Sequence, residues 1–290
     1  MSRPLPILAV QAPPVSVADG LGIFSEQARR VLGSFPRAEF MIFPEFHLHA
    51  GPDGRPGSED QLLDQAQPLD GPRVAELGRL AAELGIWLLP GSVCESDGAG
   101  NFYNTAVVFS PAGDLVAAYR KCFPWRPYET ATPGDRFVVF DVEGVGRIGL
   151  AICYDIWFPE VARQLASMGA EFIVAPTQTT TCDREQELIL LRAAAISNQL
   201  FVVSVNTAAP VGTGRSLVVD PEGRVRTKAG DAETVLSDVV DLDDVTRVRR
   251  FGTAGLTRPW SQFAENDAPL ELPLYSGRID PARWRTHDAE

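Results

Sequence analysis

The chain has 290 residues, of which 45% are apolar and 22% are charged. Because this is an ordinary globular composition, it argues against a disordered chain and against a coiled coil. The sequence holds 26 Lys and Arg against 38 Asp and Glu, which gives a net charge of −12. A chain this acidic, with no basic run, is a poor partner for nucleic acids and for anionic membranes.

Neither a membrane span nor an export signal is visible in the sequence. No apolar stretch approaches the ~20 residues that a membrane-spanning helix needs. The apolar run near the N-terminus is too short and too broken for a signal peptide, so the cytoplasm is the expected location. In that reducing compartment we expect free thiols, because no cysteine belongs to a Cys-x-x-Cys motif. The cysteines are Cys94, Cys122, Cys153 and Cys182.

Apolar runs alternate with amphipathic stretches through the first half of the chain. Apolar runs bounded by turn residues predict strands at residues 5–10, 40–43 and 86–89. Apolar residues at helical spacing predict helices at residues 17–33 and 74–84. A turn sequence, Pro-Ala-Gly-Asp, joins two further runs and predicts a hairpin of strands 102–109 and 115–119.

The second half of the chain continues this alternation. The same patterns predict strands at residues 145–153, 172–175 and 200–205, helices at 159–167 and 184–198, and a hairpin of 216–220 with 224–227. Strands alternating with helices imply sheets covered by helices, and the embedded hairpins imply mixed sheets. The sequence therefore predicts a single α/β domain over residues 1–250. Residues 251–290 are expected to form an extended C-terminal tail.

Reactive side chains follow the predicted strands at three places. Glu45 comes just after the second strand, Lys121 follows the first hairpin, and Cys153 ends an apolar strand shortly before a helix. A thiol between a strand and a helix resembles the placement of a nucleophile elbow, with backbone N–H groups nearby for an oxyanion.

A cysteine nucleophile needs a base or a nearby cation, because a free thiol has a pKa of about 8.5. The base could be a histidine, either His47 or His49, although the sequence shows no orienting Asp or Asn beside them. Alternatively, the Glu45 carboxylate takes the proton, with the Lys121 ammonium balancing the charge.

Several motifs resemble those of the nitrilase, or carbon–nitrogen hydrolase, superfamily. Each motif alone is weak, but together they cover the chain from about residue 5 to 240. They are the Gln at 11, F-P-E at 43–45, P-G-S-x-x-E at 90–95, N-T-A at 104–106, Y-R-K at 119–121, C-Y-D-x-x-F-P-E at 153–160 and G-R-S-L-V-V-D-P-E-G at 214–223.

This resemblance implies a four-layer αββα sandwich with two mixed sheets, which dimerises with the C-terminal extension near the interface. It also implies a hydrolase that needs no cofactor and no metal. On the matching positions Cys153 is the nucleophile and Glu45 the general base. Lys121 and the backbone N–H of Tyr154 stabilise the oxyanion, and Glu129 matches a second glutamate near the substrate.

The residues after the nucleophile bear on the substrate. The Tyr154-Asp155 pair is similar to the amidase and carbamoylase branches, which favours a small amide over a nitrile, with N-carbamoyl amides as the alternative. Many relatives carry a basic residue where Trp157 stands here, and this departure argues against recognition of an acidic group on the substrate. Thr177 and Gln178 follow a strand on the side expected for the pocket, so either could bind substrate, although this Thr-rich loop could instead cap the next helix.

Two other classes of protein compete with this interpretation. A metal-dependent hydrolase is suggested by His47-x-His49, but it needs further ligands, and the remaining histidine, His287, is in the tail. A catalytically silent binding or scaffold protein of the same fold is the second alternative. Loss of the glutamate, lysine or cysteine would mark such a protein, and all three are present.

Overall fold

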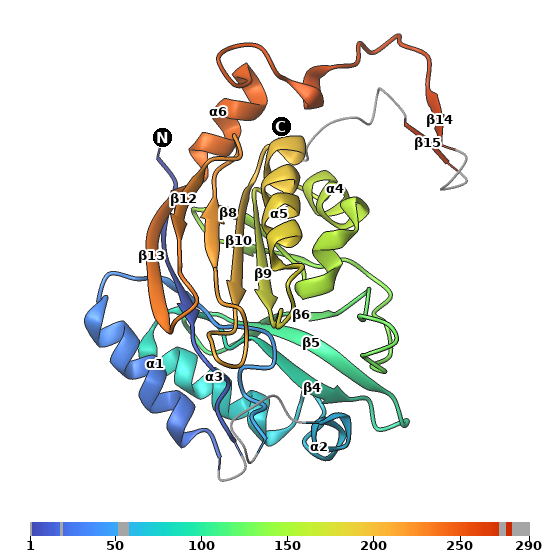
Figure 1. Cartoon of the computed structure of the whole chain (residues 1–290). Helices are drawn as coiled ribbons and strands as arrows, with labels where there is room; N and C mark the ends of the chain where they lie inside the picture. Colours follow the sequence, from blue (N-terminus) through green and yellow to red (C-terminus); the bar gives the residue numbers. More distant parts are fainter. Residues whose placement is uncertain (1, 18–19, 52–57, 273–276, 280–290) are drawn as a thin grey trace.

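The computed structural model describes residues 2–17, 20–51, 58–272 and 277–279. Two mixed β-sheets lie face to face, and helices cover their outer faces (Figure 1). The first sheet has the order β13-β1-β2-β3-β5-β4, with β6 also paired to β5. Its strands are β1 (Pro4–Gln11), β2 (Phe40–Ile42), β3 (Trp87–Leu89), β4 (Ser92–Ser96), β5 (Phe102–Phe109), β6 (Leu115–Arg120) and β13 (Thr234–Asp241).

The second sheet has six strands in the order β12-β11-β10-β9-β8-β7. They are β7 (Val139–Val142), β8 (Gly146–Leu150), β9 (Phe172–Thr177), β10 (Phe201–Asn206), β11 (Leu217–Val219) and β12 (Val225–Lys228). The helices are α1 (Gly22–Ser34), α2 (Glu59–Asp64), α3 (Pro72–Leu84), α4 (Pro159–Ser167), α5 (Arg184–Asn198) and α6 (Asp243–Phe251), with short 3₁₀ turns η1 (Cys153–Trp157) and η2 (Pro259–Ser261). A small pair, β14 (Leu270–Leu272) and β15 (Gly277–Ile279), lies in the C-terminal extension.

Alternation along the central strands creates the layers. In β1, Ile7 belongs to the core between the two sheets, whereas Leu8 packs toward α1 and α3. In β9, Val174 faces the core between the sheets, and Ile173 packs toward α4 and α5. Since successive side chains of a strand point to opposite faces, strands buried on both sides appear in the sequence as unbroken apolar runs. The four-layer αββα sandwich is thereby confirmed.

Some predicted boundaries were wrong. The helix expected over residues 17–33 begins only at Gly22, and the strand expected over 145–153 is β8, which ends at Leu150. Cys153 therefore stands in η1 rather than in a strand. The sequence patterns also missed β4, β7, β13, α2 and α6.

The beginning of the C-terminal extension is docked on the domain rather than extended. Trp260 in η2 is 8% exposed, and its Nε1 donates a hydrogen bond to the backbone oxygen of Asn198, 3.1 Å away. The Arg163 guanidinium lies 4.8 Å from the centre of the Trp260 ring. His287 lies outside the described residues. Among the described residues, the helices are all too short or too polar to cross a membrane.

Candidate active site

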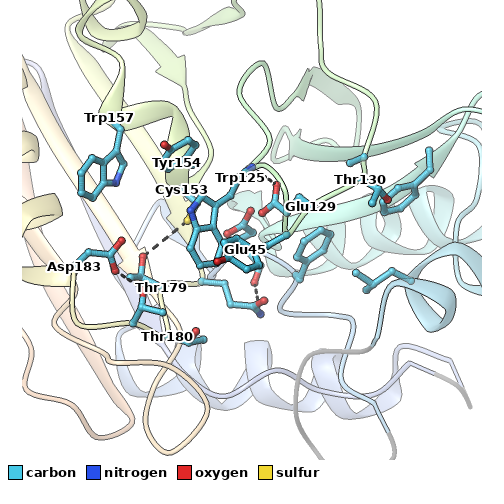
Figure 2. A pocket seen from close by; sticks show the side chains of 17 residues that line it. Glu45, Trp125, Glu129, Thr130, Cys153, Tyr154, Trp157, Thr179, Thr180 and Asp183 are labelled. Atoms are coloured by element: carbon cyan, nitrogen blue, oxygen red, sulfur yellow. Dashed lines mark hydrogen bonds between the residues drawn. The ribbon is translucent and has the colours of Figure 1, made fainter.

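The predicted reactive residues gather at one pocket. Glu45 follows β2, Lys121 follows β6, and Cys153 follows β8 as the first residue of η1. Glu45, Glu129 and Cys153 line a pocket of about 330 Å³, in which Figure 2 shows their side chains close together. Lys121 lies behind this wall and is 1% exposed. The turns that follow strands of both sheets thus supply the site.

Lys121 is the positively charged group that holds the two carboxylates of the site. Its Nζ donates to Glu45 Oε1 at 2.9 Å and to Glu129 Oε1 at 2.7 Å. Burial by itself would lower the pKa of Lys121, but the charge of Glu45, with those of Cys153 and Glu129, raises that pKa above its ordinary value. The side chain therefore stays an ammonium ion. Two of its three N–H groups are used by the carboxylates, which leaves one to donate elsewhere.

Both carboxylates are held by further hydrogen bonds. Asn104 Nδ2 donates to Glu45 Oε1 at 2.8 Å, and the backbone N–H of Trp125 donates to Glu129 Oε2 at 3.1 Å. Burial raises the pKa of Glu45, and the Lys121 charge opposes that shift. Because both bonds to Glu45 within the described residues go to Oε1, its Oε2 is available to take a proton.

The Cys153 thiol rests in its neutral form. Burial and then the charge of Glu45 raise its pKa well above the usual range, although Lys121 and the backbone N–H of Gln178 lower it. A neighbouring ammonium therefore does not suffice to hold a thiolate here. Attack by this thiol on a substrate would need a base that removes its proton. Cys153 also has a φ of 47°, a left-handed conformation that is strained for a residue with a Cβ and is typical of functional turns.

Asp155 fixes the turn that carries Cys153. Its Oδ2 accepts hydrogen bonds from the Tyr119 hydroxyl and from the backbone N–H of Ile152, each at 2.8 Å. Its Oδ1 accepts from the backbone N–H of Phe123 at 2.9 Å. Burial raises the pKa of Asp155 to about 6. This carboxylate ties η1 to the segment that follows β6, and so it sets Cys153 relative to Lys121.

Thr179 connects Cys153 to a buried ion pair that the sequence patterns did not indicate. Its Oγ1 lies 3.9 Å from Cys153 Sγ and donates to Glu187 Oε2 at 2.6 Å. Glu187 in turn pairs with Arg184 at 2.9 Å, and both side chains are at most 2% exposed. Opposite charges three residues apart on a helix usually form an exposed pair. The sequence therefore gives no sign that Arg184 and Glu187 are buried.

The two proposed substrate-binding residues lie in different environments. Gln178 lines the pocket, and its Nε2 donates to the backbone oxygen of Glu45 at 3.3 Å. Thr177 is fully buried at the end of β9 and does not line the pocket. Its hydroxyl lies 3.2 Å from Ser204 Oγ and 3.1 Å from the backbone oxygen of Ala175. The alternation of side chains along β9 puts Thr177 on the same face as Ile173, the face covered by α5, and the loop composition did not reveal this.

The two neighbouring histidines do not line this pocket. Burial lowers the pKa of His47 and of His49 to about 3, so both rings are neutral. His47 Nε2 lies 2.8 Å from Gln27 Oε1, and His49 Nε2 accepts from the backbone N–H of Cys94 at 3.1 Å. Both histidines are part of the packing behind the pocket, and neither is placed to take the proton of the Cys153 thiol. Within the described ranges, no group of three or more His, Cys, Asp or Glu side chains is placed to hold a metal ion.

Comparison with known proteins identifies relatives of this chain. The sequence profile of the carbon–nitrogen hydrolase family matches residues 9–250. The chain is 37% identical to omega-amidase NIT2 of Mus musculus over 204 residues, which is 64% of this chain and 73% of the relative. It is 34% identical to omega-amidase NIT2 of Danio rerio over 250 residues, covering 80% of this chain and 86% of the relative.

Solved structures are similar as well. Nit3 of Saccharomyces cerevisiae, a member of the nitrilase superfamily, matches with a TM-score of 0.76 and 26% identity, covering 86% of this chain and 94% of the other. A mutant amidase from Nesterenkonia sp., with the acetamide moiety of fluoroacetamide covalently added at its active-site cysteine, matches with a TM-score of 0.69 and 25% identity, covering 86% and 94%. This chain belongs to the carbon–nitrogen hydrolase family.

Proposed function

We propose that Cys153, Glu45, Lys121 and Glu129 hydrolyse a small amide to an acid and ammonia in this pocket. The chain is a cysteine-dependent amidohydrolase, since its relatives include omega-amidases and an amidase with a covalently modified cysteine. The observation that carries the assignment of residues is the Lys121 ammonium, which bridges Glu45 and Glu129 beside a half-buried, neutral thiol. This arrangement pairs a nucleophile with a base and a fixed positive charge.

The first half of the reaction forms a thioester. Cys153 Sγ attacks the amide carbon while Glu45 removes the thiol proton. The oxygen that becomes negative accepts hydrogen bonds from the backbone N–H of Tyr154 and from the third N–H of Lys121. Glu45 then returns the proton to the amide nitrogen, because ammonia leaves readily only when the nitrogen is protonated.

The second half hydrolyses the thioester. Glu45 removes a proton from water, the water attacks the acyl carbon, and the proton passes to Cys153 as the acid leaves. Glu129, held by Lys121 and Trp125, accepts a hydrogen bond from the amide NH₂ group and so orients the substrate. Preorganised charges of this kind stabilise the transition state without further rearrangement.

An amide should be hydrolysed at least about tenfold faster than its matched nitrile, because the donors are placed for an oxyanion rather than for charge on nitrogen. Ammonia release from butyramide and from butyronitrile, measured as kcat/KM, tests this expectation. N-carbamoyl compounds belong in the same screen as the alternative substrate class. A higher kcat/KM for the nitrile would contradict the proposal. Glu129→Gln should impair the amide more than the nitrile, since a nitrile has no N–H to donate.

We also propose that the chain acts as a cytoplasmic homodimer whose C-terminal extension lies near the interface. Exposed apolar side chains on α5 support a second copy on this face, with Ile189 67% and Ile196 48% exposed and seven positions apart. Light scattering should give twice the 31.5 kDa chain mass or an even multiple of it, whereas a monomer mass at micromolar concentration would refute the dimer.

The free cysteines support the cytoplasmic location, because they fit a reducing compartment. Cell fractionation tests the location.

A further inference from the structure

Within the described residues, the charged side chains that line the pocket all carry the same sign. They are Glu45, Glu129 and Asp183. Lys121, the cation behind them, is buried and bonded to two of these carboxylates. A carboxylate on the substrate would therefore lose its hydration beside acidic groups, and the described part of the lining offers it no arginine or lysine partner, which is costly.

Aromatic rings form a large part of the remaining described lining. The rings of Trp125 and Tyr128 lie 4.5 Å apart, and those of Tyr154 and Trp157 lie 6.0 Å apart. Phe46 and Phe102 complete the aromatic lining. The face of an aromatic ring attracts a cation and also packs well against a methylene chain. This wall fits an alkyl chain with a positive end.

Asp183 is the acidic residue of the pocket that the proposed reaction does not use. It precedes α5, but its side chain makes no capping hydrogen bond to that helix. Its carboxylate accepts from the Thr181 hydroxyl, and no ion pair to it occurs among the described residues. In Figure 2, Asp183 and Glu129 lie to opposite sides of Cys153. An amide held at Glu129 and Cys153 can thus point its far end toward Asp183.

Building on the proposed amidase function, we propose that the pocket selects amides whose far end carries an ammonium group, with Asp183 as the residue that determines this specificity. The ammonium would lie between the Asp183 carboxylate and the aromatic wall. A neutral alkyl amide would gain only the packing, and a carboxylate-bearing amide would face repulsion.

Three amides of matched length test the proposal: 6-aminohexanamide, heptanamide and adipamate. We expect kcat/KM for 6-aminohexanamide to exceed that for adipamate at least about tenfold, since a single well-placed charge pair is worth that factor. Preference for adipamate would overturn the inference and leave the amidase function standing, because an amide is still hydrolysed. Failure to hydrolyse any of the three would overturn the amidase function and the inference together.

Variants of Asp183 identify its role. Asp183→Asn keeps the shape and should lower the ratio of kcat/KM for 6-aminohexanamide over heptanamide about tenfold. Asp183→Lys should raise the kcat/KM for adipamate relative to heptanamide. Asp70→Asn is the matched control, because Asp70 is exposed and does not line the pocket, and this variant should leave both ratios at their wild-type values. An unchanged ratio in Asp183→Asn, with a wild-type circular dichroism spectrum, would exclude Asp183 as the determinant.

Discussion

Cys153→Ala should retain less than about a thousandth of the wild-type kcat, because loss of a covalent nucleophile removes the whole thioester route. Alanine keeps the Cβ, so the left-handed backbone at this position, with its φ of 47°, is no more strained than in the wild type. The lost sulfur leaves only a small space at the pocket wall, so we expect the free energy of unfolding to change by less than about 2 kcal/mol. Ammonia release and urea unfolding measure the two effects.

Two further variants make this test specific. Cys182→Ala is the matched control, because Cys182 is exposed, does not line the pocket and undergoes the same chemical change; it should keep wild-type activity. Cys153→Ser keeps a nucleophilic atom in place, but a hydroxyl is far harder to deprotonate, so this variant should be nearly as inactive as the alanine variant. A Cys153→Ala protein that keeps several per cent of the activity would sink the covalent mechanism.

Glu45→Gln should lower kcat by a factor of about 10² to 10⁴, which is the usual contribution of a general acid–base group. Glutamine can still accept the hydrogen bonds that Asn104 and Lys121 make to Oε1. Its amide nitrogen, however, takes the place of Oε2 and cannot accept a proton. The shape of the site is kept and the proton transfer is lost.

The pKa of the Cys153 thiol distinguishes between two roles of Glu45: a base that removes the thiol proton, and a charge that only raises the pKa of the thiol. The charge of Glu45 raises the pKa of Cys153, so its removal should lower that pKa and give more thiolate at neutral pH. The rate of alkylation by iodoacetamide, followed against pH, should therefore show its rise at lower pH in Glu45→Gln than in the wild type. Turnover should fall even though the thiolate fraction increases. A variant with more thiolate and more turnover would show that Glu45 is not the base.

The pH dependence of the wild type follows from the same groups. Glu45 acts as a base only when deprotonated, and burial raises its pKa. We therefore expect kcat/KM of the wild type to decrease as the pH drops through this raised pKa. The residual kcat/KM of Glu45→Gln should not show this decrease at acidic pH. Glu171→Gln is a matched control, because Glu171 is likewise buried and ion-paired, with Arg3, but lies outside this pocket. It should keep the wild-type pH profile.

The buried strands could be predicted from the sequence alone. Strands such as β1, β9 and β10 are apolar on both faces because they lie between two covered layers, and that burial is written into unbroken apolar runs. β13 was missed because it mixes apolar residues with Asp238 and Asp241, as a partly exposed strand does, and only its pairing along β1 defines it. Pairing between residues so far apart in the chain leaves no local signal.

The sequence also determined which groups could react, since Glu45, Lys121 and Cys153 each follow a strand and resemble a family pattern. Only the tertiary structure decided how they are charged. Burial raises the pKa of the Cys153 thiol and so keeps it neutral, and burial lowers the pKa of His47 and of His49 so that both rings are neutral too. The tertiary structure likewise decided the lining of the pocket, because residues from distant segments, such as Trp125 and Asp183, share one wall only after the two sheets have packed. A pKa depends on the solvent and charges around a group, and a specificity pocket depends on which side chains meet, and neither quantity exists until the chain has folded.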